Sequence, residues 1–357
     1  MLRVLFAGLG AIGQRHLRNL HALVGPDLEI AAFRVRRHMA VVTERLELDT
    51  EDSVESRYGI RVFDELETAL AAFDPALVFV CNPTSLHLDV AIPAARAGAN
   101  LFIEKPLAAS LDGAEELARI VEERRLTALV GFQMRFHPCF LRLRQLIADG
   151  AVGRLIAVRA RHGEYLPGFH PYEDYRQSYA ARQALGGGVI LTQIHDIDYL
   201  VALLGVPERV LAMGGHLSAL EIDVEDVASI SLAMRLDGSA LPVHLHQDYV
   251  TRPPVRTCSL LGDAGSIEVD FRTPSLTRIG PSGETIEHLS FPGFERNQMF
   301  VDLLRHLLGC LSGDEKPVVG VREAMRTQRV ALAARESLRT GQVIQTALEG
   351  VRCHPKD

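Results

Sequence analysis

The sequence predicts two units, an α/β unit with a doubly wound parallel sheet and then an α+β unit with an open, mostly antiparallel sheet. Three observations support this. The chain has 357 residues, too many for one hydrophobic core of ordinary size. Short apolar runs alternate with amphipathic stretches in the first part, and longer strand-like segments separated by Gly, Pro and Asp follow. We expect the division to fall between 1–125 and 126–357.

The composition is that of a globular protein, with 47% apolar and 23% charged residues. A net charge of -7 argues against nucleic acid as a partner, because phosphate binding needs a basic face. No apolar run approaches the roughly 20 residues that span a bilayer, so no membrane is expected either. Five scattered cysteines without CxxC spacing favour a reducing cytoplasm and predict no metal site. His244 and His246 share one strand face without a third ligand, which favours a surface or interface position.

The first element is an apolar strand at 3–7, followed by GLGAIG at 8–13 and an amphipathic helix. This is the GxGxxG turn of a Rossmann unit in its required strand–turn–helix context. Gly8 permits the tight turn, Gly10 lets the backbone approach a pyrophosphate, and Gly13 allows close packing of helix and strand. The helix N-terminus offers free N–H groups to phosphates. We predict a dinucleotide held by Gly8, Gly10, Ala11, Ile12 and Gly13.

The second strand, at 28–33, is followed by Arg34 and Arg36. NAD enzymes usually carry Asp or Glu here to bind the ribose 2′-OH. Arginine instead pairs well with a 2′-phosphate, so the cofactor is expected to be NADP or NAD, with NADP preferred. The alternative is that these arginines form a solvated basic loop.

Further strands are predicted at 76–83, 99–106 and 127–132, with helices between them. Ligands of doubly wound sheets bind at the carboxyl ends of the strands. Polar residues at these ends are therefore predicted to line the cofactor site: Asn82, Pro83, Thr84, His87, Glu104, Lys105 and Gln133.

Three motifs stand in order: GxGxxG at 8–13, EKP at 104–106 and GGGVILTQIHDID at 186–198. Together they resemble the Gfo/Idh/MocA family of NAD(P)-dependent oxidoreductases over nearly the whole chain. The resemblance implies hydride transfer between NAD(P) and a secondary alcohol or ketone of a sugar, cyclitol or nucleotide sugar. It also implies a second domain that binds substrate and pairs sheet to sheet, giving a homodimer or homotetramer. The segment 168–188, together with QMRFHP at 133–138, resembles a branch of the family often met in bacterial surface-sugar pathways.

The resemblance implies that Lys105 lies near the nicotinamide and that His195 is the general acid/base. Many members place an aspartate about one helical turn before this histidine, where this chain has Thr192 and Gln193. Thr192 can hydrogen-bond but cannot stabilise an imidazolium as a carboxylate does. Either another carboxylate replaces the aspartate, or proton transfer relies on Lys105 and His195, with Thr192 beside them. The candidate replacements are Asp196, Asp198 and Glu173.

The segment 168–188 is dense in polar and aromatic residues and is predicted to be a loop over the substrate, a solvated loop being the alternative. The stretch 189–205 is predicted to form one helix after the glycines. Substrate contacts are predicted from both regions and from the 133–138 motif: Arg135, His170, Tyr172, Asp174, Tyr175, Arg176, His195 and Asp198.

Two other functions remain open from the sequence. One is a redox-neutral glycosidase that retains NAD and oxidises its substrate transiently. The other is a non-catalytic dinucleotide-binding sensor, which the missing aspartate supports and which Lys105 and His195 oppose.

Overall fold

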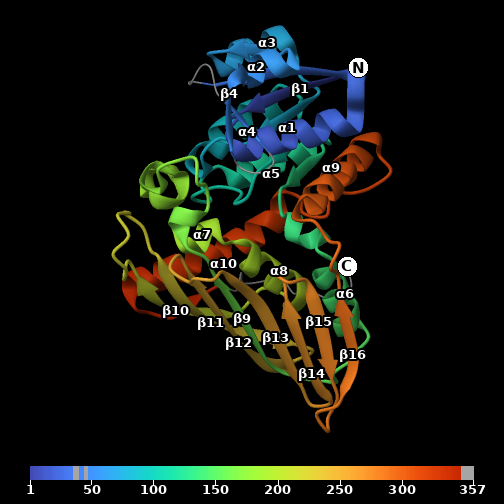
Figure 1. Cartoon of the computed structure of the whole chain (residues 1–357), viewed down its shortest axis with the longest axis vertical. Coiled ribbons are helices and arrows are strands. Elements are labelled where there is room, and N and C mark those ends of the chain that lie inside the picture. Colours follow the sequence, from blue (N-terminus) through green and yellow to red (C-terminus); the bar gives the residue numbers. More distant parts are fainter. Residues whose placement is uncertain (35–39, 44–46, 347–357) are drawn as a thin grey trace.

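The computed structural model describes residues 1–34, 40–43 and 47–346. The first unit holds a six-stranded parallel sheet in the order β5-β2-β1-β6-β7-β8 (Figure 1). In chain order this is 3-2-1-4-5-6, the Rossmann arrangement, so the predicted fold is confirmed. The strands are β1 (Leu2–Ala7), β2 (Leu28–Phe33), β5 (Arg61–Phe63), β6 (Leu77–Val80), β7 (Asn100–Ile103) and β8 (Ala128–Val130).

Helices flank this sheet because each buries one apolar face and leaves a polar face to solvent. In α1, for example, Leu17 and Leu20 are fully buried while His21 and Ala22 are exposed. The helices are α1 (Ala11–Val24), α2 (Val54–Tyr58), α3 (Leu66–Phe73), α4 (His87–Arg96) and α5 (Ala114–Glu123). A separate antiparallel pair joins β3 (Ala40–Val42) and β4 (Leu48–Ser53).

The second unit is built on a nine-stranded sheet in the order β16-β15-β14-β13-β9-β12-β11-β10-β17. All its pairings are antiparallel except that of β9 with β12, which confirms the expected open, mostly antiparallel sheet. Its strands are β9 (Leu155–Gly163), β10 (Arg209–Gly215), β11 (Val227–Leu236), β12 (Ser239–Asp248), β13 (Val255–Gly262), β14 (Gly265–Asp270), β15 (Ser275–Ile279), β16 (Thr285–Ser290) and β17 (Ile344–Gln345).

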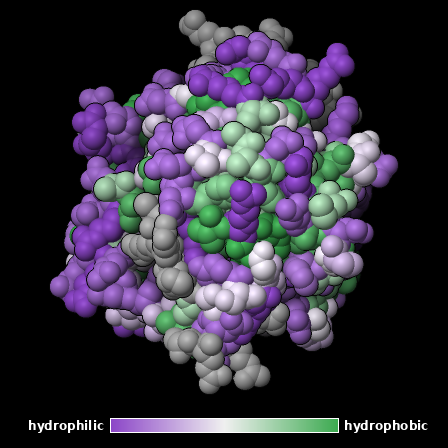
Figure 2. All heavy atoms as spheres, turned by 90° about the horizontal axis from the view of Figure 1, so that it is seen from above, coloured by the Kyte–Doolittle hydropathy of each residue, from purple (hydrophilic) through white to green (hydrophobic). Residues whose placement is uncertain are grey.

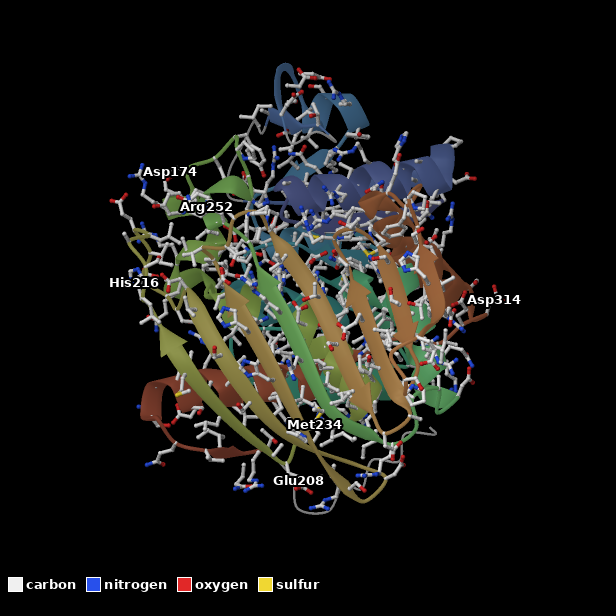
Figure 3. All side chains as sticks on the ribbon, turned by 60° about the horizontal axis from the view of Figure 1, so that its bottom comes forward. Asp174, Glu208, His216, Met234, Arg252 and Asp314 are labelled. Atoms are coloured by element: carbon white, nitrogen blue, oxygen red, sulfur yellow. The ribbon has the colours of Figure 1, made fainter. Side chains whose placement is uncertain are left out.

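One face of this sheet is covered by helices and the other is open (Figure 3). The strands alternate accordingly: Ala228, Ile230 and Leu232 of β11 are buried, whereas Ser229 and Ser231 face outward. The helices of this part are α6 (Pro138–Ala148), α7 (Val189–Thr192), α8 (His195–Leu204), α9 (Arg296–Ser312) and α10 (Val321–Thr340).

The last two long helices return to the first unit. Leu303, Leu304 and Leu307 of α9 are fully buried in the core that includes α1 and β1, and Asn297 exchanges hydrogen bonds with Asn19. The expected division at residue 125 falls just before β8, which is hydrogen bonded into the first sheet. The two units therefore share packing through α9.

The helix predicted as continuous over 189–205 is broken, so that prediction is wrong. Helix α7 ends at Thr192 and α8 begins at His195. The carbonyl of Thr192 accepts a hydrogen bond from Lys105 Nζ at 2.9 Å, and that of Gln193 accepts one from Gln247 Nε2 at 2.7 Å. These side chains take the carbonyls that would continue the helix.

Polar residues cover most of the face seen from the first unit's end, around a more apolar central area (Figure 2). Within the described ranges no single helix is long and apolar enough to cross a membrane, although the bent pair 183–192 and 195–204 meets that test by length and composition. In this bent pair, α8 is almost wholly buried in the protein core.

Candidate functional site

The glycine turn connects β1 to α1 at the point where the strand order reverses. Gly8 has φ +96°, and a Cβ there would lie 2.8 Å from Cys81 and Asn82 at the end of β6. A Cβ on Gly13 would lie 2.4 Å from the Gly8 carbonyl oxygen. Both glycines are therefore required by the packing of the protein itself, as the sequence predicts.

Gly10 differs from these two, because nothing in the structure requires it to be glycine. Its φ of −66° suits any residue, and no atom of the described residues lies within 4 Å of a Cβ built there. It begins α1 without a side-chain cap, so no capping side chain takes the first N–H groups of the helix, beginning at Ala11 and Ile12. This cradle fits a dinucleotide pyrophosphate, which needs close approach to bare backbone.

Arg34 does not extend toward a ribose in this structure. It follows β2, is 5% exposed, and forms an ion pair with Glu55 of α2. Burial lowers the pKa of its guanidinium. Arg36, the other predicted contact for a 2′-phosphate, lies outside the described residues.

The loop after β6 carries four predicted cofactor contacts. His87 is buried between the carbonyl oxygens of Asn82 (3.0 Å) and Pro106 (2.9 Å), so it ties this loop to the EKP segment. Thr84 follows Pro83 and packs against the three glycines at 186–188, since a Cβ on Gly186 would lie 2.8 Å from it. Only Asn82 keeps a buried oxygen, Oδ1, without a hydrogen-bond partner in the described structure.

The carboxylate of Glu104 points into the protein interior, toward α1. Its Oε1 lies 2.6 Å from Nε2 of His16 on α1, and its Oε2 accepts the backbone N–H of Lys105 at 3.1 Å. Burial raises the pKa of Glu104, but the hydrogen bond and charge of His16, with the charge of Lys105, bring the net result below its usual value. Glu104 therefore links α1 to Lys105.

Lys105 and Thr192 are brought together, though not through the threonine side chain. The Lys105 ammonium donates to the backbone carbonyl of Thr192 at 2.9 Å. The Thr192 hydroxyl is buried, and no hydrogen bond of suitable geometry reaches it from the described residues. Thr192 thus orients the lysine through its backbone, at the break between α7 and α8.

His195 lies beside them, buried at the start of α8. Gln133, at the end of β8, places its amide nitrogen 3.0 Å from His195 Nε2. The oxygen of that amide has no partner among the described residues, and neither has Nδ1 of His195. Turned by half a rotation, the same amide accepts from a protonated Nε2, so Gln133 can accompany either protonation state.

Burial is the largest cause that lowers the pKa of His195, which lies well below its usual value. The positive charges of Lys105 and Arg256 lower it further. The imidazole is therefore neutral near pH 7 and can accept a proton.

None of the three carboxylates weighed as replacements contacts His195. Asp196 pairs with His162. It also accepts hydrogen bonds from Nε and Nη2 of the Arg256 guanidinium, both at 3.0 Å. Asp198 pairs with Arg135 at 2.6 and 2.9 Å in a buried ion pair, and Glu173 lies 2.6 Å from His170. Arg135 and Asp198 are both predicted to bind substrate, but in this structure they form an ion pair with each other.

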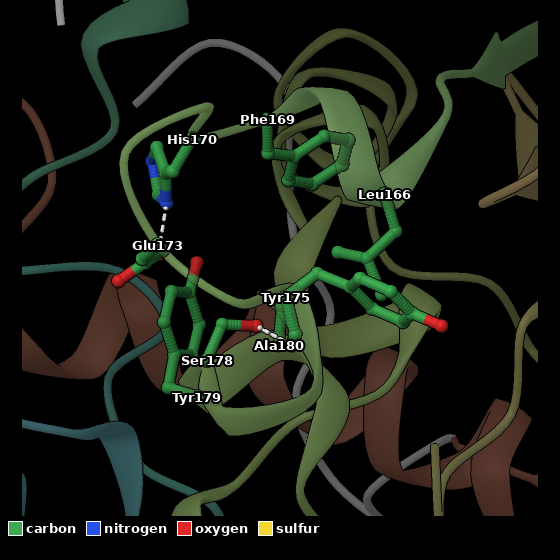
Figure 4. Close-up of a pocket in the computed structure, with 8 residues that line it drawn as sticks. All are labelled: Leu166, Phe169, His170, Glu173, Tyr175, Ser178, Tyr179 and Ala180. Carbon is green, nitrogen blue, oxygen red and sulfur yellow. Dashed lines mark hydrogen bonds and ion pairs between the residues drawn. The ribbon is translucent and has the colours of Figure 1, made fainter. Parts of the chain in front are cut away.

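The segment 168–188 forms a series of short 3₁₀ turns, η4 (Leu166–Gly168) to η7 (Gln183–Leu185). Figure 4 shows the small pocket that it encloses, lined by Leu166, Phe169, His170, Glu173, Tyr175, Ser178, Tyr179 and Ala180. About 10 Å³ of free volume admits one water and no sugar. Asp174 and Arg176 pair with each other at the surface, and the Tyr172 ring stacks on His170 with ring centroids 5.5 Å apart.

Sequence reasoning missed His162, Arg256 and Arg296, which act electrostatically on His195. They come from the end of β9, the start of β13 and the start of α9, and no motif joins them. The one feature of the sequence that could have pointed to these three residues is that each lies near the end of a strand or helix. Among the described residues, no group of His, Cys, Asp and Glu could hold a metal.

The sequence of this chain matches a known family in both of its units. Residues 2–132 match the oxidoreductase family with an NAD-binding Rossmann fold, and residues 140–268 match the GFO/IDH/MocA C-terminal domain. A scyllo-inositol 2-dehydrogenase (NAD(+)) from Bacillus subtilis is 26% identical over 93% of each chain. A 2,7-anhydro-N-acetylneuraminate hydratase from Mediterraneibacter gnavus is 26% identical over 56% of this chain and 53% of its own.

The fold also matches solved structures. A dehydrogenase from Bordetella pertussis, in complex with NADH and UDP-GlcNAcA, superposes with a TM-score of 0.77. It is 22% identical, and the match covers 98% of this chain and 99% of that one. With both halves matched in order, the chain belongs to the GFO/IDH/MocA family of oxidoreductases.

Proposed function

We propose that this oxidoreductase transfers a hydride between NAD(P) and a secondary alcohol or ketone of a sugar, cyclitol or nucleotide sugar. The observation that carries the proposal is that Lys105 binds the Thr192 carbonyl and Gln133 binds His195 on the two sides of the break between α7 and α8, while α1 begins at Gly10 without a side-chain cap. The inositol dehydrogenase among the relatives supports the substrate class, and the resemblance of 133–138 supports a role in surface-sugar biosynthesis.

The residues divide the work of moving a proton. The Lys105 ammonium, oriented by the Thr192 carbonyl, donates a hydrogen bond to the substrate oxygen. During oxidation, neutral His195 accepts the hydroxyl proton, and during reduction its protonated form returns it. The nicotinamide supplies the hydride chemistry when bound. The glycine turn, the 82–87 loop and Glu104 hold this arrangement against α1.

The choice of dinucleotide is proposed to lie at Arg34. The sequence favours NADP, yet the Arg34 guanidinium pairs with Glu55 in this structure. A 2′-phosphate would have to compete with the Glu55 carboxylate for the guanidinium of Arg34. Titration with NADH and NADPH decides the preference, and a strong preference for NADH would refute the role of Arg34.

The open face of the nine-stranded sheet supports a homodimer or homotetramer. A broad hollow there, with small and apolar residues at its centre, runs across β9, β12, β11 and β10 and includes Ala157, Leu211, Ala233 and Pro242. Such faces commonly pair with a second copy. The four described cysteines are buried and unpaired, which supports the cytoplasm as location.

A redox-neutral reaction is the second candidate. The relative named as a hydratase favours it, because adding water leaves no net oxidation. Both candidates need the same cradle, so they differ in stoichiometry. After the titration, a panel of sugar alcohols, cyclitols and oxidised nucleotide sugars is supplied with the preferred dinucleotide. Net NAD(P)H change with turnover supports the dehydrogenase, and substrate loss without it supports the second candidate.

A further inference from the structure

The imidazole of His195 is held by two consecutive residues of the first unit. Gln133 begins η3 (Gln133–Phe136), shortly after β8, and its amide nitrogen lies 3.0 Å from Nε2 of His195 at the start of α8. Gln133 is 6% exposed and His195 5%, so water competes little for this contact. The ring of Phe132 meets the imidazole edge-on, with ring centroids 5.8 Å apart. These two contacts fix the plane of the histidine ring.

The direction of the Gln133 hydrogen bond decides which ring nitrogen carries the proton. With the amide nitrogen toward the ring, the amide N–H donates to Nε2, so the neutral imidazole has its proton on Nδ1. The lone pair of Nε2 is then occupied, and the ring has no second lone pair to accept a proton. Oε1 of Gln133 and Nδ1 of His195 are both buried without a partner among the described residues. In this orientation His195 cannot act as a base.

Rotation of the amide by half a turn reverses these roles, because the two ends of an amide have nearly the same shape. Oε1 of Gln133 then accepts from Nε2–H of His195, and the free lone pair lies on Nδ1. After Nδ1 takes a proton, the same oxygen still accepts from Nε2–H, and this hydrogen bond favours the charged ring. The amide oxygen thereby supplies part of what a carboxylate would supply at this position.

The charges around His195 make such an acceptor necessary. Burial is the largest cause that lowers its pKa, and basic side chains from four other segments lower it further: Lys105, Arg256, His162 and Arg296. On its own helix, Asp196 binds His162 and Arg256, and Asp198 binds Arg135. Within the described ranges, the side chain in hydrogen-bond contact with the imidazole is therefore the neutral amide of Gln133.

We infer that Gln133 is the positioning residue of His195: its side-chain oxygen accepts from Nε2–H, which leaves Nδ1 to exchange the proton of the substrate alcohol. This rests on the proposed function and replaces the cofactor contact expected for Gln133. During oxidation the hydroxyl proton moves to Nδ1, while the alcohol carbon gives its hydride to the oxidised dinucleotide and becomes a carbonyl carbon. Reduction reverses both transfers, and Gln133 itself exchanges no proton.

The first measurement needs no turnover. The NADH-loaded enzyme is labelled with ¹⁵N in histidine, and the signals of His195 are identified by their loss in His195→Asn. The shifts show which ring nitrogen carries the proton, and a pH titration gives the pKa. We expect the Nε2–H form in the wild type. In Gln133→Glu the pKa of His195 should rise by at least ~1 unit, because a carboxylate in contact favours the imidazolium.

The second measurement is the pH profile of oxidation at saturating dinucleotide. The acid limb of kcat should move upward by about the same amount in Gln133→Glu. Gln133→Met keeps the length of the side chain without its hydrogen bond, and kcat should fall by ~10-fold or more. Gln145→Glu is the matched control, because it adds the same charge at an exposed position of α6. Thermal unfolding and NADH affinity establish that each variant is folded.

The inference is overturned if the NADH-loaded wild type carries its His195 proton on Nδ1, or if the pKa of His195 is unchanged in Gln133→Glu. It is also overturned if Gln133→Met keeps its kcat and binds NAD(P)H more weakly, since Gln133 is then a contact of the dinucleotide. If Gln133→Met does not fold, the wild-type tautomer and Gln133→Glu still decide. Failure of the proposed function looks different: the His195 signals follow the expected pattern, yet no substrate of the panel changes NAD(P)H.

Discussion

Thr192 occupies the position at which the family resemblance implies an aspartate, and its observed contact comes from the backbone. The Lys105 ammonium reaches its carbonyl at 2.9 Å, whereas no hydrogen bond of suitable geometry reaches its hydroxyl from the described residues, although the Tyr249 hydroxyl lies near it. A carbonyl oxygen orients a lysine without adding negative charge. The proton carrier is therefore proposed to be His195, kept neutral by burial and neighbouring cations.

Thr192→Ala should retain activity, because it keeps the carbonyl that holds Lys105. We expect kcat within about 3-fold of the wild type, far less than the roughly 10²-fold loss expected on removing a proton-transfer group. Steady-state rates of NAD(P)H formation provide the check. A hundredfold loss in Thr192→Ala would assign the chemistry to its hydroxyl.

Glu55→Gln should shift the cofactor preference toward NADPH. The change removes the carboxylate that pairs with Arg34 and frees a guanidinium for a 2′-phosphate. We expect the ratio of the Kd for NADH to that for NADPH to rise by about 10-fold. Glu67→Gln, an exposed change on α3, is the control. An unchanged ratio in Glu55→Gln would place the discrimination elsewhere.

The strand–turn–helix of β1 and α1 separates the demands of folding from those of binding. A Cβ on Gly13 meets the Gly8 carbonyl at 2.4 Å, whereas a Cβ on Gly10 meets no atom of the described part of the chain within 4 Å. The same motif therefore contains one glycine needed for packing and one needed for an incoming ligand.

Gly13→Ala and Gly10→Ala should consequently fail in different ways. Gly13→Ala should lower the unfolding free energy by about 1–3 kcal/mol through overpacking. Gly10→Ala should leave the stability of the cofactor-free protein within about 0.5 kcal/mol and weaken NAD(P)H binding. Thermal unfolding and dinucleotide titration measure the two effects. A strongly destabilised Gly10→Ala protein would contradict this division.

The sequence predicts these elements best where a motif coincides with periodicity. GxGxxG, EKP and the glycine–histidine motif place the Rossmann unit, Lys105 and His195, and the family comparisons confirm the fold. Pairings between distant residues are not encoded locally. The turn of Glu104 toward His16, the Arg135–Asp198 pair and the break after Thr192 each depend on a side chain far away in the sequence.

At the scale of the whole molecule, the described buried histidines whose pKa is lowered make stability depend on pH. Burial is the largest cause that lowers the pKa of His87, His137 and His195. The unfolded chain binds these protons below pH 6.5 while the folded chain does not, so the unfolding free energy falls as the pH falls. The carboxylates with lowered pKa values, such as Asp196 at about 2, add losses only at lower pH.

His137→Asn isolates one part of this effect. The pKa of His137 is lowered to about 4, and its Nδ1 caps α6 by accepting the N–H of Cys139. Asparagine preserves the cap without titrating. The wild type should lose about 3 kcal/mol through His137 between pH 6.5 and 4, a loss that the variant lacks. Denaturant unfolding at both pH values tests this, and parallel pH curves would argue against it.

The central claim is that Lys105, with His195, manages the proton of a hydride transfer between the two units. Its most direct test is NAD(P)H formed per substrate consumed, in the wild type and in Lys105→Ala. The account predicts a ratio of one in the wild type, and kcat lowered roughly 10²–10⁴-fold in Lys105→Ala at saturating NAD(P). Unchanged kcat in the variant, or substrate consumption without net NAD(P)H, would contradict it.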